Sequence, residues 1–223
     1  MINKEVASLE LAIEEIHDGA TILSSGFGDA GNPVALLEAL ADSNVTNLTV
    51  VSNNAGEGDY GLAALIKSEK VSKIICSYPI SAGSTIFQDF YNLGKIQLEI
   101  IPQGTLSERM RAAGAGIGAF FCPTSTGTKL GEGKEKRMIN GIEYVLEYPL
   151  KGDFALIQGS KADRFGNIIY EKSARNFGPV MAMAAKKTIF QVNKIVNIGE
   201  IDPELIVTPG IFVDRIVVNN AEN

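Results

Sequence analysis

The residues Gly26-Phe27-Gly28-Asp29-Ala30-Gly31 spell G-x-G-x-x-G, a spacing that suits the binding of an anion. An apolar run, residues 20–23, precedes this stretch, and a helix-like run, residues 34–40, follows it. A glycine-rich turn between a strand and a helix lets backbone N–H groups approach a phosphate, and the helix N-terminus adds partial positive charge. The spacing therefore predicts a loop that binds an anionic group of a small-molecule ligand.

A nicotinamide dinucleotide is a common ligand of this motif, but it requires one further residue. A carboxylate near the end of the second strand, about 20 residues on, would hold a ribose hydroxyl. Here the second predicted strand, residues 48–51, leads into Ser52-Asn53-Asn54-Ala55-Gly56, and the carboxylates of Glu57 and Asp59 follow only later. The sequence therefore argues against a dinucleotide-binding oxidoreductase.

No other motif supplies a complete set of catalytic groups. His17 is the single histidine, so neither a Ser-His-Asp set nor a usual zinc site can be assembled, and we predict no metal site. Neither G-x-S-x-G nor G-x-x-x-x-G-K-[ST] occurs. We expect Cys76 to be a buried apolar residue and assign no chemistry to Cys122. The chain thus offers loops that can hold a phosphate and amide side chains, but no nucleophile. This is what we expect of a chain that supplies half of an active site.

Composition limits the class of protein. The chain has 223 residues, 45% of them hydrophobic, which is enough for one substantial core, and we expect a single domain over residues 1–223. A formal net charge of −6 without any basic run argues against nucleic-acid binding. No apolar run approaches the roughly 18 residues of a membrane span, and no signal-peptide pattern is present. The two cysteines form no disulfide framework, so a reducing cytoplasmic setting is expected.

Short β-rich runs alternate with helix-period runs through the first half of the chain. We predict strands at residues 20–23, 48–51, 71–76 and 96–101, and helices at residues 6–16, 34–40, 60–67, 84–93 and 105–112. Asn32 and Pro33 are expected to start the second of these helices, and Thr105 and Glu108 to form a capping box in the last. This alternation predicts an α/β fold with a mostly parallel sheet, flanked by helices on both faces.

The second half is less regular. Residues 113–134 are rich in Gly, Ser and Thr, and we expect a looser middle insertion there. Further strands are predicted at residues 144–146, 154–157, 168–170, 188–192 and 211–218, with a turn at residues 163–167 and a helix at residues 181–185.

Three loops that follow predicted strands hold the polar residues of interest. They are the glycine loop, the Asn53-Asn54 turn and the Pro102-Gln103-Gly104 turn. Ligands of parallel sheets bind beyond the carboxyl ends of the strands. We therefore expect these loops to meet at one edge of the sheet.

A series of motifs extends over nearly the whole chain, in order. They are Asp18-Gly19, Gly26-Phe27-Gly28, Gly31-Asn32-Pro33, Ser52-Asn53-Asn54-Ala55-Gly56, Pro102-Gln103-Gly104-Thr105-Leu106-Ser107-Glu108-Arg109, Gly114-Ala115-Gly116-Ile117-Gly118-Ala119-Phe120, Pro123-Thr124, Ala174-Arg175-Asn176-Phe177 and Thr208-Pro209-Gly210-Ile211. Together they resemble the A-subunit signature of the family I CoA-transferases. Residues 54–58, 61–65, 116–121 and 176–179 are most similar to the A subunits that act on 3-oxoadipate.

This resemblance implies a CoA-transferase (NagB/RpiA-like) fold and a ping-pong transfer of CoA from succinyl-CoA to 3-oxoadipate. In the family, a glutamate carboxylate attacks the acyl-CoA to give an acyl-glutamyl anhydride and free CoA thiolate, which then forms a glutamyl-CoA thioester. The acceptor acid reverses the sequence. That glutamate belongs to the B subunit, in a Ser-Glu-Asn-Gly-like motif that this chain lacks. The implied partner is therefore a B subunit, in a heterodimer or heterotetramer, with coenzyme A thioesters as substrates and no permanently bound cofactor.

The resemblance also assigns roles to individual residues. Residues Ser25-Gly26-Phe27-Gly28-Asp29-Ala30-Gly31 match the loop that binds CoA in the family. Gln103 matches a glutamine that donates to the developing oxyanion, an interaction worth about 3 kcal/mol, although on its own it also fits a turn residue. Asn53 and Asn54 are either turn formers or amides that line the substrate site. Ser25 replaces a usual glycine, so either its hydroxyl replaces a contact or CoA lies slightly differently.

The sequence leaves two other functions open. The same chemistry on acetoacetate, butyrate or acetate would use the same motifs, and no sequence feature separates these acids. A ligand-sensing or phosphosugar-binding module could use the same kind of sheet. Such a sensor would carry an attached DNA-binding segment, and none is visible in this sequence.

Overall fold

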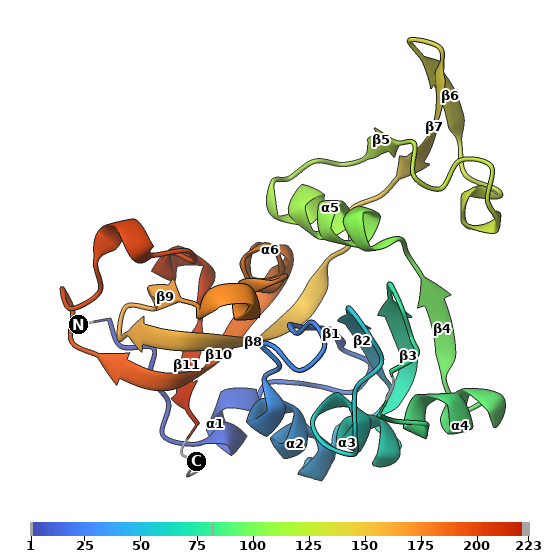
Figure 1. Ribbon diagram of the computed structural model, residues 1–223. Helices are drawn as coiled ribbons and strands as arrows, with labels where there is room; N and C mark the ends of the chain where they lie inside the picture. The colour runs from blue at the N-terminus through green and yellow to red at the C-terminus, as the bar shows by residue number, and fades with distance from the viewer. Residues whose placement is uncertain (1, 82, 220–223) are drawn as a thin grey trace.

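The computed structural model describes residues 2–81 and 83–219 and is built around a long parallel sheet (Figure 1). The strand order is β11-β10-β8-β1-β2-β3-β4, and each neighbouring pair is parallel, while β9 pairs antiparallel with β8. The strands are β1 (Thr21–Ser24), β2 (Leu48–Ser52), β3 (Val71–Cys76), β4 (Gln97–Ile100), β8 (Gly152–Asp163), β9 (Ile168–Ile169), β10 (Ala185–Val196) and β11 (Arg215–Val218). The predicted α/β fold is confirmed.

Helices cover both faces of this sheet, as expected. Helices α1 to α4 lie on one face, and α5 and α6 lie on the other (Figure 1). Their bounds are α1 (Leu9–Ile13), α2 (Val34–Asp42), α3 (Leu62–Lys67), α4 (Ile86–Asn92), α5 (Gln103–Gly114) and α6 (Gly178–Ala184). Short 3-10 helices lie at η1 (Lys129–Gly131), η2 (Lys172–Arg175), η3 (Pro203–Leu205) and η4 (Gly210–Phe212). None of the helices in the described residues is both long and apolar enough to cross a lipid bilayer.

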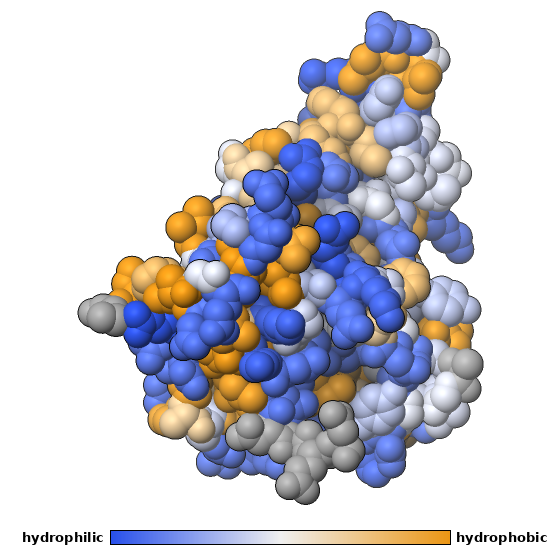
Figure 2. All heavy atoms as spheres, turned by 60° about the vertical axis from the view of Figure 1, so that its left-hand side comes forward, coloured by the Kyte–Doolittle hydropathy of each residue, from blue (hydrophilic) through white to orange (hydrophobic). Residues whose placement is uncertain are grey.

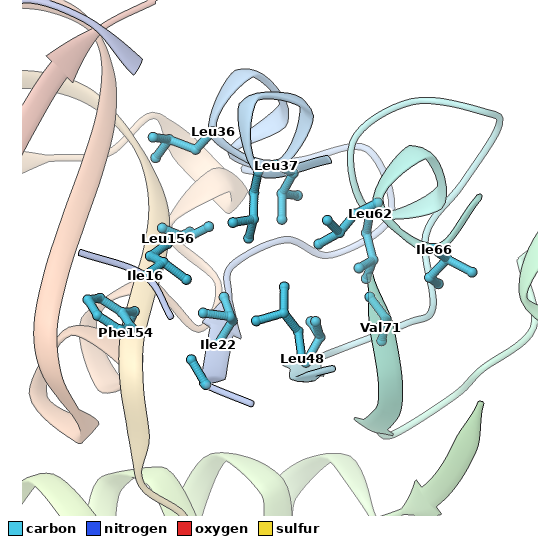
Figure 3. Close-up of a cluster of buried hydrophobic side chains, with 14 of the residues drawn as sticks. Ile16, Ile22, Leu36, Leu37, Leu48, Leu62, Ile66, Val71, Phe154 and Leu156 are labelled. Carbon is cyan, nitrogen blue, oxygen red and sulfur yellow. The ribbon is translucent and has the colours of Figure 1, made fainter. Parts of the chain in front are cut away.

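Two buried clusters hold the layers together, because successive strand residues point to opposite faces. Ile22 and Val50 belong to the cluster under α1 to α4, whereas their neighbours Leu23 and Val51 belong to the cluster under α5 and α6. Figure 3 shows Leu37 of α2 pointing toward the strand side chains of the first cluster. Each fully buried leucine or isoleucine contributes roughly 1.5–3 kcal/mol. This core fixes the strand ends from which the polar loops start.

Strands β8 and β10 are much longer than the predicted segments 154–157 and 188–192. Each has 12 residues, and their pairing runs from Ala185 beside Gly152 to Val196 beside Asp163. Polar residues interrupt the apolar run, since Gln158, Ser160 and Lys161 follow Ile157. Backbone pairing with β10 and β9 continues through them, which an apolar pattern does not reveal.

Residues 113–134 contain only the end of α5, one three-residue strand and η1, as their Gly, Ser and Thr content predicted, but the middle of the chain as a whole is organised into a small lobe. It forms an antiparallel sheet of order β5-β7-β6, with β5 (Phe120–Cys122), β6 (Lys136–Ile139) and β7 (Ile142–Glu147). Asn140 and Gly141 join β6 to β7 with φ of 50° and 79°, the backbone that a two-residue hairpin turn requires. This lobe projects away from the main sheet (Figure 1).

The hairpin tip of the lobe carries exposed apolar side chains. Met138 and Ile142 are 63% and 54% exposed. In Figure 2 the lobe stands at the top of the molecule, with hydrophobic residues among hydrophilic ones. The tip therefore has no apolar cover within the described part of this chain.

Helix α5 starts earlier than predicted. It begins at Gln103, directly after Pro102, so Thr105 lies inside its first turn and caps nothing. Thr105 is buried, while the Glu108 carboxylate accepts from Arg111 Nε at 2.9 Å. The predicted capping box is therefore wrong, because a proline with fixed φ already starts the helix.

Candidate active site

The glycine loop leaves the carboxyl end of β1 and closes into a tight turn. Phe27 N–H donates to the Ala30 carbonyl at 3.0 Å, and Ala30 N–H donates back to the Phe27 carbonyl at 3.1 Å. Gly26, Gly28 and Gly31 have φ of 134°, 55° and 75°, in the region that favours glycine. The three glycines of G-x-G-x-x-G therefore allow the backbone to form this turn.

The tip of the turn leaves backbone donors exposed to a ligand. The N–H groups of Gly28 and Asp29 have no hydrogen-bond partner within residues 2–81 and 83–219. Adjacent N–H groups in a glycine turn can bind an electron-rich atom of a ligand. That these two N–H groups bind a ligand stays a prediction.

Ser25 turns its side chain into the protein. It is 2% exposed, and its Oγ donates to the Gly31 carbonyl at 2.7 Å and accepts from Gln158 N–H at 3.1 Å. The hydroxyl therefore ties both ends of the loop to β8. Ser25, which stands where the family usually has a glycine, thus turns its side chain away from the loop tip.

The start of α2 differs from the expectation. Asn32 does not cap the helix, because its Nδ2 donates instead to the Gly28 carbonyl at 2.6 Å. The N–H of Leu36, in the first turn, donates to Oε1 of Gln191 at 3.1 Å. Gln191 lies in β10 and is 2% exposed. A buried residue from a distant strand thus provides the cap, and no sequence signal close to the helix indicates it.

Carboxyl groups flank one side of the loop tip. Tyr60 Oη donates to Asp29 Oδ1 at 2.7 Å, and Glu57 lies beside Gly28 in a hollow that Asn54 also lines. Burial, together with the neighbouring Asp29 carboxyl, raises the pKa of Glu57. The hydrogen bond to Asp29 raises the pKa of Tyr60 as well. This flank favours an uncharged or protonated group of a ligand over a phosphate.

Gln103 is held at the same sheet edge by a group from a neighbouring strand. Its Nε2 donates to Asn53 Oδ1 at 2.6 Å, and Ser77 Oγ donates to the same oxygen at 2.8 Å. Asn53 directly follows β2, Ser77 follows β3, and Gln103 starts α5 after β4. Gln103 is exposed, so its second Nε2 hydrogen can reach a ligand. The arrangement can present one oriented amide donor to a developing negative charge.

The two asparagines have different environments. Asn53 is 7% exposed, and its backbone carbonyl also accepts from the N–H groups of Ser77 and Tyr78. Asn54 is half-buried, and its Oδ1 accepts from Gly56 N–H at 3.1 Å, as a turn former does. Asn53 thus supports Gln103, while Asn54 shapes the loop that reaches Glu57. Contact of either residue with substrate stays a prediction.

The remaining groups considered for chemistry lie elsewhere. His17 precedes β1, at the opposite edge of the sheet from the loops, and its Nδ1 contacts the Asp18 carbonyl. Cys76 is buried, which raises the pKa of its thiol to about 12. Within residues 2–81 and 83–219, no group of His, Cys, Asp and Glu is arranged to hold a metal ion.

The match with a protein family fits this arrangement. A family model described as coenzyme A transferase matches residues 6–219. The chain belongs to the coenzyme A transferase family. The family resemblance stated from the motifs is therefore confirmed.

Curated relatives match almost the whole chain. The chain is 57% identical to the A subunit of 3-oxoadipate CoA-transferase from Acinetobacter baylyi, over 97% of this chain and 95% of that protein. It is 56% identical to the Pseudomonas putida protein of the same name, over 97% and 94% of the two chains. The A subunit of a "Probable succinyl-CoA:3-ketoacid coenzyme A transferase" from Bacillus subtilis is 43% identical over 99% of this chain and 92% of that one.

Solved structures confirm the fold of this coenzyme A transferase family member. An acyl-CoA transferase of Escherichia coli O157:H7, solved as a thioester complex with CoA, has a TM-score of 0.87 at 22% identity. It aligns with all of this chain, which spans only 50% of that longer chain. Glutaconate coenzyme A-transferase of Acidaminococcus fermentans has a TM-score of 0.84 at 22% identity, over 96% and 75% of the two chains.

Sequence reasoning found part of this site and missed its supports. Gln103 and Asn53 are in contact, and the glycine loop approaches the loop that follows Asn53, as the shared sheet edge predicted. Ser77 was missed, although it follows the apolar run of β3 as Asn53 follows that of β2. Asn176, Gln158 and Gln191 were also missed as supports, because their partners lie far away in sequence.

Proposed function

We propose that this chain is the A subunit of a CoA-transferase that moves CoA from succinyl-CoA to 3-oxoadipate. The observation that carries the proposal is Gln103, an exposed amide held by Asn53 with one hydrogen left free. The two relatives at 57% and 56% identity, both named for 3-oxoadipate, support the choice of acceptor. We also propose that residues 1–223 form one domain.

The nucleophile is assigned to a partner B subunit. The partner's glutamate carboxylate attacks the succinyl-CoA carbonyl, a C–O bond forms, and the C–S bond breaks to release CoA thiolate. The thiolate then attacks the glutamyl carbonyl of the anhydride, which releases succinate and leaves a glutamyl-CoA thioester. The 3-oxoadipate carboxylate repeats these steps in reverse and leaves with the CoA.

Gln103 supplies the electrostatic part of this scheme. Each attack puts negative charge on a carbonyl oxygen, and a fixed N–H donor stabilises that charge more than it stabilises the ground-state carbonyl. The hydrogen bond from Gln103 to Asn53 limits side-chain rotation before substrate arrives. Gln103 acts in this role without forming a covalent bond.

The loop Ser25–Gly31 is proposed to receive the CoA ester, with contacts made chiefly by the N–H groups of Gly28 and Asp29. The carboxyls of Asp29 and Glu57 disfavour a diphosphate next to them. We therefore place the uncharged pantetheine arm of CoA at the loop tip. The free thiols of Cys76 and Cys122 are consistent with a reducing, cytoplasmic setting for this chemistry.

The test uses the purified chain, a purified B-type subunit with a Ser-Glu-Asn-Gly-like motif, and their mixture. We expect transfer from succinyl-CoA only in the mixture, and highest kcat/KM with 3-oxoadipate in a panel that includes acetoacetate, butyrate and acetate. Full activity of this chain alone would contradict the division of labour. A clear preference for acetoacetate would instead favour the reaction named for the Bacillus subtilis relative.

A further inference from the structure

Asn176 has a backbone conformation that is unusual for any residue with a side chain. It lies between η2 and α6, with φ of 23° and ψ of −116°. Glycine adopts such positive φ values at little cost, whereas other residues pay of order 1–3 kcal/mol. The surrounding structure must therefore compensate for an asparagine at this position.

The compensation comes from the side-chain amide, which uses its full hydrogen-bonding capacity. Asn176 Oδ1 accepts from the N–H groups of Phe177, at 2.7 Å, and Gly26, at 3.1 Å. Its Nδ2 donates to the carbonyls of Ala174 and Ala30, both at 3.0 Å. An amide has two acceptor sites and two donor hydrogens, so none is left over.

Two of these four bonds reach the glycine loop from about 150 residues away. Gly26 and Ala30 lie on the two opposite arms of the Phe27–Ala30 turn. A single side chain therefore holds both arms at once. The loop is also held by the two backbone bonds of the turn, by the Asn32 amide and by the Ser25 hydroxyl, but none of these links both Gly26 and Ala30 to another segment.

Close packing at Gly31 shows that the loop and the Asn176 segment fit directly against each other. A Cβ atom on Gly31 would lie 2.3 Å from the Ala174 carbonyl oxygen and 2.6 Å from Asn176 Nδ2. No side chain can be inserted there. The position of the loop is thus set by the segment that carries Asn176.

We propose that Asn176 is the positioning residue of the CoA-binding loop, holding Gly26 and Ala30 so that the Gly28 and Asp29 N–H groups face the CoA ester. This inference rests on the proposed function of the loop. Asn176 has no contact with the reacting atoms in this assignment. It acts through the shape of residues 25–31, so its loss should weaken binding of the CoA ester more than it slows the chemical step.

The decisive variant is Asn176→Gly, because it relieves the backbone strain and removes only the amide. Lys172→Gly is the matched control. Lys172 also has positive φ, 48°, in the same segment, but its side chain is largely exposed, and within residues 2–81 and 83–219 its ammonium pairs with Glu171 alone, at 3.8 Å. Both variants should fold, and a general effect of glycine in this segment would appear in both. Asn176→Asp is the more disruptive case, because it loses both donors and sets a carboxylate oxygen against the Ala30 and Ala174 carbonyl oxygens.

In the complex with the B subunit, we expect Asn176→Gly to raise KM for the acyl-CoA about tenfold, the size of one lost hydrogen bond to a positioned group. The KM for the free acid and the melting temperature should stay within twofold and within a few degrees of wild type. Asn176→Asp should raise the KM for acyl-CoA at least as much, and Lys172→Gly should match wild type. An unchanged KM for acyl-CoA in Asn176→Gly would overturn the proposal, as would an equal change in Lys172→Gly.

A second measurement on the full chain does not depend on catalysis. The Gly26 amide should exchange its hydrogen about tenfold faster in Asn176→Gly than in wild type, and at the wild-type rate in Lys172→Gly. If the complex shows no CoA transfer but Gly26 exchange responds in this way, the proposed function is wrong, while the role of Asn176 in holding the loop is supported. If transfer occurs and Gly26 exchange is unchanged, Asn176 does not position the loop.

Discussion

Gln103 donates one of its two Nε2 hydrogens to Asn53, and the other has no partner among residues 2–81 and 83–219. Gln103→Ala should therefore lower kcat by roughly 10²-fold, because it removes a donor that bonds most strongly to the oxyanion. Gln97→Ala is the matched control, since Gln97 is also an exposed glutamine and lies on the adjoining strand β4. Steady-state kinetics of the complex would give both values. Equal rates for Gln103→Ala and wild type would show that Gln103 only starts α5 and does not stabilise the oxyanion.

Asn53 should influence the rate only through Gln103. Asn53→Ala removes the acceptor that fixes the glutamine, and we expect kcat to fall about tenfold through lost orientation. The double variant Asn53→Ala/Gln103→Ala should then be no slower than Gln103→Ala alone, because residues that act as a unit are not additive. Full additivity in this double-mutant cycle would show that Asn53 has an independent role.

Glu57 should give the stability of the chain a pH dependence. Burial and Asp29 raise its pKa in the folded chain, so as pH rises the unfolded chain loses this proton first. Stability should therefore fall between the unfolded and folded pKa values and stay lower above both. Glu57→Gln should melt higher than wild type at pH 7 but not at pH 4, in thermal scans at both pH values. Glu132→Gln, which removes an exposed carboxylate without an ion pair in the described chain, should show no such difference.

At the scale of elements, an ion pair between the half-buried Lys134 and the buried Glu147 ties the segment before β6 to β7. Glu147 is 2% exposed on β7, and the Lys134 ammonium before β6 is its partner. Lys134→Ala leaves a buried carboxylate unpaired and should lower the free energy of unfolding by about 3 kcal/mol. The exposed pair Lys136–Glu143 is the control, and Lys136→Ala should cost under about 1 kcal/mol. Urea unfolding of the two variants would test the contrast; similar midpoints would contradict it.

The elements that sequence predicted well are those whose apolar pattern matches their burial. Strands β1, β2 and β3 are buried on both faces, so their continuous apolar runs identify them. In the lobe, the predicted strand 144–146 is part of β7, whereas β5 and the largely exposed β6 were missed because they are short and lack such runs. The ends of β8 and β10 were missed because their pairing continues through polar residues. Backbone pairing outside the core thus leaves little trace in composition.

At the scale of the whole molecule, the fold joins polar groups that are far apart in the chain. Motifs located the glycine loop and Gln103, because each follows a recognisable strand. The Gln103–Asn53 contact spans 50 residues, the Asn176–Gly26 contact 150 and the Gln191–Leu36 contact 155. Local spacing carries no information about such pairs. Their partners became clear only once the strand order placed β8 beside β1 and β10 on the other side of β8.

The division of labour between two chains makes a prediction about the whole assembly. When the complex is incubated with acyl-CoA and no acceptor acid, CoA should accumulate as a thioester on the partner's glutamate. Intact-mass spectrometry of the separated subunits should show the CoA adduct on the partner and none on this chain, because the proposal assigns the nucleophilic glutamate to the partner. The Gln103→Ala complex should reach the same adduct more slowly, because Gln103 stabilises the oxyanion of the transition state and not the thioester product. An adduct on this chain, formed with or without the partner, would contradict the assignment.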